Sequence, residues 1–338
     1  MPAADHRAFY AAGIARIDLT APEYDRWITS PFLDGELGPN GTALVIVHGR
    51  PERIPSPGSL PMVVCAVGDE FGGYGPLAAD VVVSERDLDD LTARVASAPI
   101  AAVTLATLLR AVPHVGPDVA LALESAAYST LQAGPEFATW RSVHPVGTPP
   151  ADDGPTVSVG RDGDVLRIVL DRPARHNAIS ARLRDDLYEA LALAVADDTI
   201  RRVELRGNGP SFCSGGDLAE FGSRPDPATA HTTRLARSPA RLLHLLGERV
   251  VAHVHGATLG GGAELAAFCG RVVAAPGTRF ALPEIGLGLI PGAGGTVSLT
   301  RRIGRQRTAA LGLTGRAIDA GTALAWGLVD DVSTARPA

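Results

Sequence analysis

The sequence contains no lysine, so every permanently cationic side chain in its 338 residues is an arginine. A phosphate on any ligand would therefore be bound by arginine, by histidine or by backbone N–H groups. The same absence excludes a Walker-type phosphate loop, which needs a Gly-Lys-Ser or Gly-Lys-Thr ending. The formal net charge of −6 also argues against a nucleic-acid partner or an anionic membrane surface.

Cysteine is scarce as well. Cys65, Cys213 and Cys269 form no CxxC pair and no metal-ligand spacing, and so few cysteines in a long chain are typical of a reducing compartment. The N-terminus has no apolar signal-peptide core. The longest plain apolar run, 99–109, is far shorter than the roughly 20 residues that a membrane span needs. We therefore expect a soluble, cytoplasmic protein with no metal and no membrane partner.

The composition that remains is that of a globular protein. Hydrophobic residues make up 46% of the chain and charged residues 20%, which allows a sizeable core in a chain long enough for two domains. Residues 142–153 are rich in proline and aspartate and poor in apolar residues, as linkers are. We therefore expect an N-terminal domain over 1–150 and a C-terminal domain over 151–338.

Short apolar segments alternate with helical patterns along the chain. Strands are predicted at 43–48, 62–67, 79–84, 156–159, 165–170, 202–206 and 250–254. Helices are predicted at 24–30, 85–96, 99–112, 119–132, 181–196, 241–247, 305–313 and 320–326, with Ser180 as an N-cap. Strands and helices that alternate at this spacing predict an α/β fold with parallel strand pairing.

Two glutamates stand in glycine-rich apolar surroundings. Glu264 follows the triple glycine 260–262, and Glu284 precedes an apolar run broken only by glycines. Burial disfavours a carboxylate anion, so both pKa values should rise, and two such groups facing one cavity would form a general acid/base pair. The alternatives are an ordinary glutamate in a helix first turn for Glu264 and a partly exposed structural glutamate for Glu284.

Backbone N–H groups near these glutamates could bind an oxyanion. The triple glycine opens a helix, whose first N–H groups carry partial positive charge, and the loop 211–217 follows a predicted strand end, where α/β sheets tend to bind ligands. A nucleophilic role for Ser214 would need a nearby histidine, which nothing in the sequence places. Asp217 is interpreted as a capping or turn residue. His253 and His255 are interpreted as core histidines or as residues that support the site.

Taken together, these segments resemble the crotonase (enoyl-CoA hydratase/isomerase) superfamily over roughly residues 156–332. The resemblance rests on ordered motifs: D-R-P-A-R-H-N-A-I at 171–179, S-F-C-S-G-G-D-L at 211–218, G-A-T-L-G-G-G-A-E-L-A at 256–266 and F-A-L-P-E-I-G-L-G-L-I-P-G-A-G-G-T at 280–296. Each motif alone is a weak signal, whereas four in the family's order are specific.

The resemblance implies roles for individual residues. The N–H groups of Ser214 and Gly261 would bind the thioester oxygen, Glu264 would be the base toward water, and Glu284 would protonate Cα. The residues implied to contact the coenzyme A ester are Arg175, His176, Ala178, Ser214, Gly215, Gly216, Asp217 and Leu218. From the residues alone, a solvated loop is the alternative for Arg175 and His176.

The resemblance also implies an activity, a substrate and an assembly. With both glutamates present, we expect a hydratase that adds water to a 2-enoyl-CoA, with coenzyme A as part of the substrate and no other cofactor. A double-bond isomerase or a C–C hydrolase of CoA esters is the alternative enzyme, and a non-catalytic CoA-binding or scaffolding subunit is the alternative from another class. Members of this family assemble, so a homo-oligomer, a trimer or a hexamer, is expected.

The N-terminal half departs from the family pattern. Family members continue after the segment matching 327–332 with further helices that complete the CoA site, and here residues 80–145 look like those helices instead. The segment 62–83 also echoes 250–274, with Pro76 in the place of Glu264. We interpret the N-terminal half as a shortened, degenerate crotonase-like copy without catalytic function. Its helices should pack on the C-terminal spiral of ββα units, within the chain or across a subunit boundary.

Overall fold

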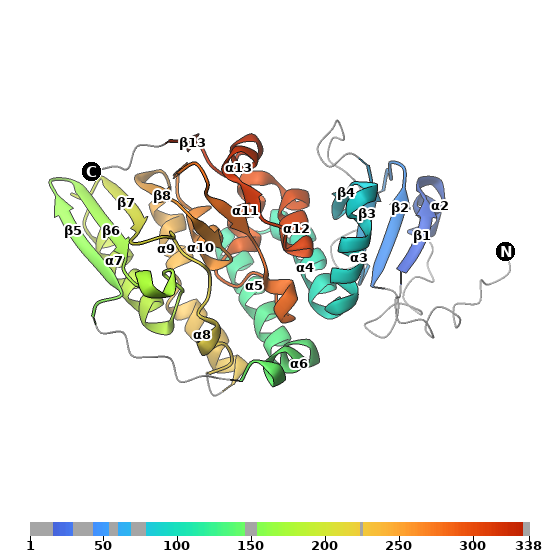
Figure 1. Cartoon of the computed structure of the whole chain (residues 1–338), viewed down its shortest axis with the longest axis horizontal. Coiled ribbons are helices and arrows are strands. Elements are labelled where there is room, and N and C mark those ends of the chain that lie inside the picture. The colour runs from blue at the N-terminus through green and yellow to red at the C-terminus, as the bar shows by residue number, and fades with distance from the viewer. Residues whose placement is uncertain are drawn as a thin grey trace.

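A computed structural model describes residues 16–29, 43–53, 60–68, 79–145, 154–223 and 226–333. An N-terminal sheet and a pair of C-terminal sheets lie at opposite ends of the molecule, with a layer of helices between them (Figure 1). The domain boundary predicted near residue 150 lies outside the described residues and stays a prediction, as does the catalytically dead copy with its Pro76.

The N-terminal sheet has four strands in the order β1-β2-β3-β4, and all its pairs are parallel. Its strands are β1 (Arg16–Thr20), β2 (Leu44–His48), β3 (Val63–Val67) and β4 (Val81–Val83). Val45 and Val47 face the helix α2 (Ala21–Trp27), while Leu44 and Ile46 face the opposite side and join the main core. Because both faces are covered, the central strands are continuously apolar.

Helix α2 begins earlier than the sequence pattern predicted. Thr20 and Glu23 form a capping box, in which the Glu23 carboxylate accepts from the Thr20 backbone N–H at 2.8 Å, and Pro22 lies in the first turn. The helix therefore covers Ala21–Trp27 instead of 24–30. The strand β1 was not predicted, because its short, half-exposed pattern lacks a continuous apolar run.

Four helices form the layer that joins the two halves. They are α3 (Leu88–Ser97), α4 (Pro99–Ala111), α5 (Pro117–Gln132) and α6 (Pro135–Val143). Glu136 of α6 accepts the first free N–H groups of α4, from Ile100 at 2.7 Å and Ala101 at 2.9 Å. Within the described ranges no single helix is long and apolar enough to cross a membrane, and Glu85–Ser97 with Pro99–His114 reach that length and composition only as a pair bent by 106°.

The C-terminal half contains a six-stranded sheet in the order β13-β10-β8-β7-β6-β5 and a three-stranded sheet in the order β12-β11-β9. The hairpin β5–β6 and the pair β11–β12 are antiparallel, and the other pairs are parallel. The strands are β5 (Val157–Asp162), β6 (Val165–Leu170), β7 (Arg202–Gly207), β8 (Val250–Val254), β9 (Ala257–Leu259), β10 (Arg271–Ala274), β11 (Arg279–Ala281), β12 (Ile318–Asp319) and β13 (Asp331–Val332).

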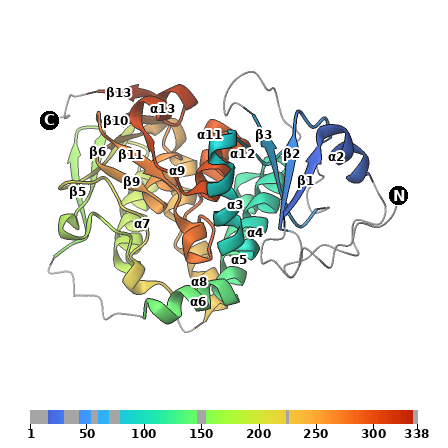
Figure 2. The ribbon, with the colours of Figure 1, turned by 45° about the vertical axis from the view of Figure 1, so that its right-hand side comes forward.

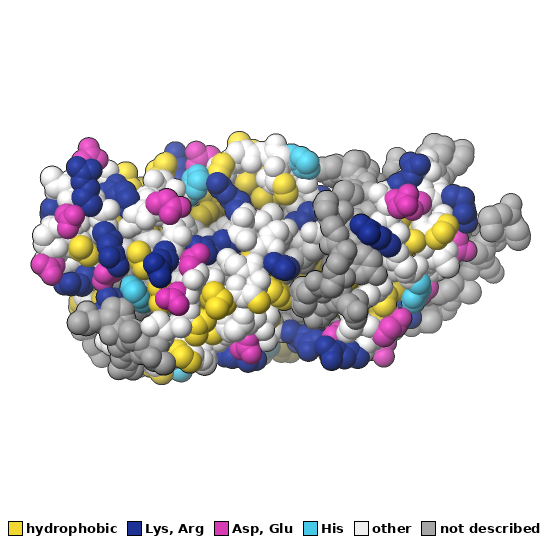
Figure 3. All heavy atoms as spheres, turned by 90° about the horizontal axis from the view of Figure 1, so that it is seen from above, with side chains coloured by type: hydrophobic (Ala, Val, Ile, Leu, Met, Phe, Trp, Pro, Cys, Tyr) yellow, Lys and Arg dark blue, Asp and Glu magenta, His cyan; other side chains and the backbone are white. Residues whose placement is uncertain are grey.

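The helices of this half are α7 (Ala181–Ala196), α8 (Pro227–Ala236), α9 (Pro239–Leu246), α10 (Gly261–Ala266), α11 (Gly295–Ile303), α12 (Arg305–Thr314) and α13 (Ala320–Trp326). Ser180 caps α7 as predicted, since its hydroxyl accepts from the Leu183 N–H at 3.1 Å. On the face shown in Figure 3, arginines are interspersed with aspartates and glutamates over this half.

One continuous core runs through both halves of the chain, from Ala43 to Val329. Helices α4 and α5 lie against α11 and α12 (Figures 1 and 2). A Cβ on Gly312 would lie 2.6 Å from Leu105 Cδ2, so α12 and α4 approach closely. The buried carboxylate of Asp80 binds Arg110 of its own half and, at 3.3 Å, Arg305 of α12. The N-terminal helices therefore pack on the C-terminal core within a single chain.

Candidate active site

A cavity of about 500 Å³ opens between the N-terminal helices and the glycine-rich loops of the C-terminal half. Helices α5 and α6 line one side, and α8 with the loop after β7 lines another. Glu124, Glu264 and Glu284 are all among its lining residues. A cavity of this size, mostly apolar with a few convergent polar groups, suits a small-molecule site.

Glu264 lies in the first turn of α10 and is 1% exposed. Its Oε2 atom accepts hydrogen bonds from the backbone N–H groups of Ala293 and Gly295, both at 2.7 Å. Burial raises its pKa well above the usual value, and the charges of Glu284 and Glu124 raise it further, while the two backbone hydrogen bonds oppose the shift. One oxygen is therefore fixed by the backbone, which leaves Oε1 for other partners.

Glu284 begins the 3₁₀ turn Glu284–Leu287 and is 8% exposed. Its Oε2 atom is buried and accepts no hydrogen bond within the described residues. Burial raises the pKa of this carboxyl to about 8. Gly260 lies against its Oε1 atom with φ of +46°, so a side chain at Gly260 would be strained and would also collide with the carboxyl. The triple glycine thus lets Glu284 approach the start of α10.

Glu124 is a third buried carboxyl that the sequence reasoning missed. It belongs to α5, is 2% exposed, and accepts hydrogen bonds from Gly294 N–H at 2.7 Å and from Thr296 N–H and Oγ1 at 2.9 and 2.6 Å. Burial raises its pKa to about 7, against the opposing effect of these hydrogen bonds. A glutamate within the apolar helix pattern L-A-L-E-S-A-A-Y was the signal available in the sequence.

The structure corrects the position of one expected oxyanion donor. The N–H of Ser214 donates to the His176 carbonyl at 3.0 Å, and Ser214 does not line the cavity. Gly216 does line it. The Gly215 carbonyl accepts a hydrogen bond from the Ile179 N–H, and the Asp217 N–H donates to the Ile179 carbonyl. Because successive peptide groups of an extended segment point in opposite directions, the Gly216 N–H points away from Ile179.

Gly261, the other expected donor, does line the cavity. It is the first residue of α10, whose first-turn N–H groups have no acceptor within the helix. A Cβ on Gly261 would lie 2.7 Å from Ile179 Cδ1, and one on Gly216 would overlap the ring of Phe221. At both positions a side chain would displace these neighbours, and glycine leaves backbone accessible where a side chain would cover it.

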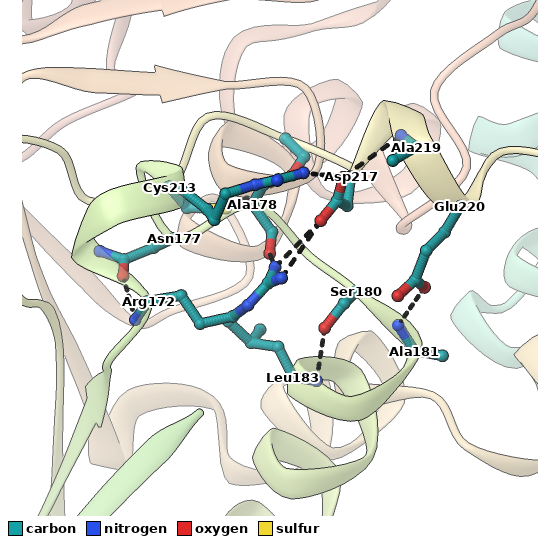
Figure 4. A network of polar contacts seen from close by, with 12 residues as sticks. Arg172, Asn177, Ala178, Ser180, Ala181, Leu183, Cys213, Asp217, Ala219 and Glu220 are labelled. Atoms are coloured by element: carbon teal, nitrogen blue, oxygen red, sulfur yellow. Dashed lines mark hydrogen bonds and ion pairs between the residues drawn. The ribbon is translucent and has the colours of Figure 1, made fainter. Parts of the chain in front are cut away.

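The residues expected to contact the CoA ester divide into two groups. Gly216 and Asp217 line the cavity, whereas the remaining ones, Arg175, His176, Ala178, Ser214, Gly215 and Leu218, do not. The Asp217 carboxylate is buried. It accepts hydrogen bonds from two nitrogens of Arg172, both at 3.2 Å (Figure 4), and from Arg175 at 3.0 Å. Asp217 also accepts the Ala219 N–H as an N-cap, as predicted, so its carboxylate holds the loop together.

The two histidines of the β8 region lie away from the cavity. His253 is half-buried, and desolvation lowers its pKa, while His255 Nε2 lies 2.9 Å from the Gly209 carbonyl. Neither residue lines the cavity. Among the described residues, no group of three or more histidine, cysteine, aspartate or glutamate side chains is arranged to hold a metal ion.

An α/β scaffold thus presents buried glutamates and two glycines at loop and helix ends to one cavity. The sequence profile of the enoyl-CoA hydratase/isomerase family matches residues 160–336. The chain therefore belongs to this family, in the crotonase superfamily.

Two curated sequence relatives support this membership. The 2,3-dehydroadipyl-CoA hydratase of Escherichia coli K12 is 40% identical over 174 residues, which are 52% of this chain and 68% of that protein. The probable mitochondrial enoyl-CoA hydratase 2 of Arabidopsis thaliana is 38% identical over 52% of this chain and 59% of its own length. The chain thus spans less than two thirds of the Arabidopsis relative. A solved enoyl-CoA hydratase from Bacillus anthracis is 35% identical with a TM-score of 0.49, over 53% of this chain and 70% of that one.

Proposed function

We propose that this protein is an enoyl-CoA hydratase, which adds water across the double bond of a 2-enoyl-CoA thioester. The observation that carries the proposal is the pair Glu264 and Glu284, both buried and both lining one cavity with the glycines of two oxyanion-type turns. The charge of Glu284 is one cause of the raised pKa of Glu264, so the two carboxyls are electrostatically close. The family and its named hydratase relatives favour the same reaction.

The thioester oxygen would accept hydrogen bonds from the N–H groups of Gly216 and Gly261. These donors would stabilise the negative charge that develops on that oxygen when water attacks Cβ, because preorganised N–H groups need no reorientation during the step. A CoA ester enters as substrate, and the scheme needs no resident metal or redox group.

The two glutamates would divide the proton transfers between them. Two neighbouring buried carboxyls do not easily ionise together, so the pair keeps at least one proton over a wide pH range. Two backbone N–H donors favour the charge on Glu264, and the absence of donors to Glu284 Oε2 favours the proton there. Glu264 would take a proton from water while the water oxygen bonds to Cβ, and Glu284 would give its own proton to Cα.

The ultraviolet absorbance of crotonyl-CoA tests this proposal, because hydration removes the conjugated double bond. The wild type should lower the absorbance, and Glu264→Gln and Glu284→Gln should each slow the change by about 10²–10⁴-fold, the usual contribution of a general acid or base. Calorimetry should show retained affinity for the CoA ester in both variants. The exposed Glu248→Gln provides a matched control.

The remaining outcomes separate the rival functions. A double-bond isomerase would move the double bond without adding water, which mass spectrometry of the product distinguishes. A non-catalytic subunit would bind the ester and leave its absorbance unchanged. Either result with wild-type protein would contradict the hydratase proposal. The proposed homo-oligomer is checked separately, by light scattering of the full-length protein.

A further inference from the structure

The loop 293–296 donates its backbone N–H groups alternately to two glutamates. Ala293 and Gly295 donate to Glu264, while Gly294 and Thr296 donate to Glu124. All four distances lie between 2.7 and 2.9 Å. The loop therefore lies between a carboxyl of the C-terminal half and a carboxyl of the N-terminal half.

This segment includes the first two residues of α11, whose first turn has no side-chain cap of its own. Gly294 occupies the N-cap position and offers no side chain, so the first N–H groups of the helix need outside acceptors. Glu264 and Glu124 provide them, and carboxylates are the favoured partners at a helix N-terminus. Thr296 adds its hydroxyl as a further donor to Glu124, at 2.6 Å.

Helix α5 holds the loop at a second point one turn further along. Tyr128 lies four residues after Glu124, on the same helix face, and its ring lies directly under Gly292. Arg234 lies over that ring, 4.7 Å from its centroid, and donates to Ser125 Oγ at 3.1 Å. The charge of Arg234 is one of the effects that lower the pKa of Glu124. These effects oppose burial, which on balance raises the pKa of Glu124 to about 7.

We infer that Glu124 is a positioning residue of the active site, which fixes the loop 293–296 so that Ala293 and Gly295 hold the Glu264 carboxyl toward the substrate. The catalytic consequence rests on the hydratase function proposed above. Glu124 lies outside the residues 160–336 that match the family profile. The N-terminal half therefore covers the C-terminal core and also contributes the Glu124 side chain to the site.

A direct electrostatic effect of Glu124 on Glu264 is the competing explanation, and it predicts a shift of the Glu264 pKa in the opposite direction. The charge of Glu124 raises the pKa of Glu264, so removing the charge alone would lower that pKa and leave the loop in place. Removing the acceptor would instead release the loop, and Glu264 would lose two hydrogen bonds that lower its pKa. The direction of the pH shift therefore distinguishes positioning from simple repulsion.

Two variants of the full-length protein test the inference, and one serves as a control. Glu124→Gln keeps the size of the side chain but turns an N–H₂ group toward donors, and Thr296→Val removes only the hydroxyl donor. Glu136→Gln is the control, because Glu136 also accepts two backbone N–H groups within the N-terminal half but does not line the cavity. Circular dichroism establishes that each variant is folded, and Thr296→Val carries the test if Glu124→Gln does not fold.

Hydrogen exchange of the peptide covering 292–297 gives a readout that needs no activity. We expect exchange there to accelerate at least about tenfold in Glu124→Gln and by less in Thr296→Val. Hydration of crotonyl-CoA should lose about 10- to 100-fold in kcat with little change in KM, as small misplacements of catalytic groups do. The pKa of the basic group in the kcat/KM profile should rise. Glu136→Gln should change exchange only at the start of α4.

Unchanged exchange at 292–297 in both variants would overturn the positioning role, whatever the activity. A lowered pKa in the kcat/KM profile with kcat retained would also overturn it, in favour of direct repulsion. If wild-type protein does not hydrate crotonyl-CoA, the proposed function fails, and hydrogen exchange still decides whether Glu124 holds the loop.

Discussion

Replacing Glu284 by glutamine should change how the stability of the protein depends on pH. Burial raises the pKa of this carboxyl from 4.5 to about 8. Below pH 4.5 the group is neutral in the folded and the unfolded states. Between the two values the folded state keeps a proton that the unfolded state releases, so the free energy of unfolding falls as pH rises through this window.

The size of the effect follows from the shift. Each unit of pKa difference corresponds to about 1.36 kcal/mol, so a shift from 4.5 to about 8 sets a ceiling on the order of 5 kcal/mol. Glutamine resembles the protonated carboxyl and releases no proton, so this loss should vanish in Glu284→Gln. Near pH 5 the variant should match wild type, and near pH 9 it should be more stable by up to that ceiling.

Urea unfolding followed by circular dichroism at a series of pH values measures this difference. Wild type and variant both keep Glu264 and Glu124. The variant lacks the Glu284 charge that raises the pKa of Glu264, so its Glu264 loses less stability as pH rises, and this effect adds to the difference in the same direction. The exposed Glu248→Gln should follow the wild-type pH dependence. Parallel curves for wild type and Glu284→Gln would refute the reasoning, because they would mean that folding does not raise the pKa of this carboxyl.

Two further predictions concern the interface between the N-terminal and C-terminal halves. Asp80→Ala should cost about 3–5 kcal/mol in the free energy of unfolding, because Asp80 is the carboxylate shared by Arg305 and the buried Arg110, whose side chain is 1% exposed. Urea unfolding beside Asp331→Ala, at a half-exposed surface ion pair, measures this cost, and a value below about 1 kcal/mol would contradict the role of Asp80. A fragment of residues 151–338 should form no soluble, cooperative fold, because it lacks the helices that complete its core. Cooperative thermal unfolding of that fragment would show that the C-terminal half is independent.

Local patterns predicted most elements around the site. The bounds of α7 and its Ser180 cap agree with the sequence prediction, because a cap residue followed by regularly spaced leucines is a signal confined to one turn and one face. The strand β8 was predicted equally well from its apolar run. Residues 1–15 and the loops that connect the first strands lie outside the described residues, so nothing tests predictions there.

The oxyanion donor shows where local reasoning fails. The loop S-F-C-S-G-G-D offers several N–H groups, and residue type does not say which one faces the cavity. Pairing with Ile179 fixes the direction of each peptide, so that Ser214 donates to His176 and Gly216 is left facing the cavity side. The isolated bridge between Ile179 and Gly216, two residues far apart in the sequence, made this choice, and no local propensity encodes it.

The sequence by itself determined the order of the motifs, the two glycine-flanked glutamates and hence the family, since each of these is written in contiguous residues. Only the tertiary structure brought Glu124 to the site, because Glu124 and its partner Gly294 are 170 residues apart. A hydrogen bond over that separation depends on α5 packing against α11, which no local pattern specifies. The burial that shifts the pKa of all three carboxyls likewise arises only in the folded chain, where residues of both halves line one cavity.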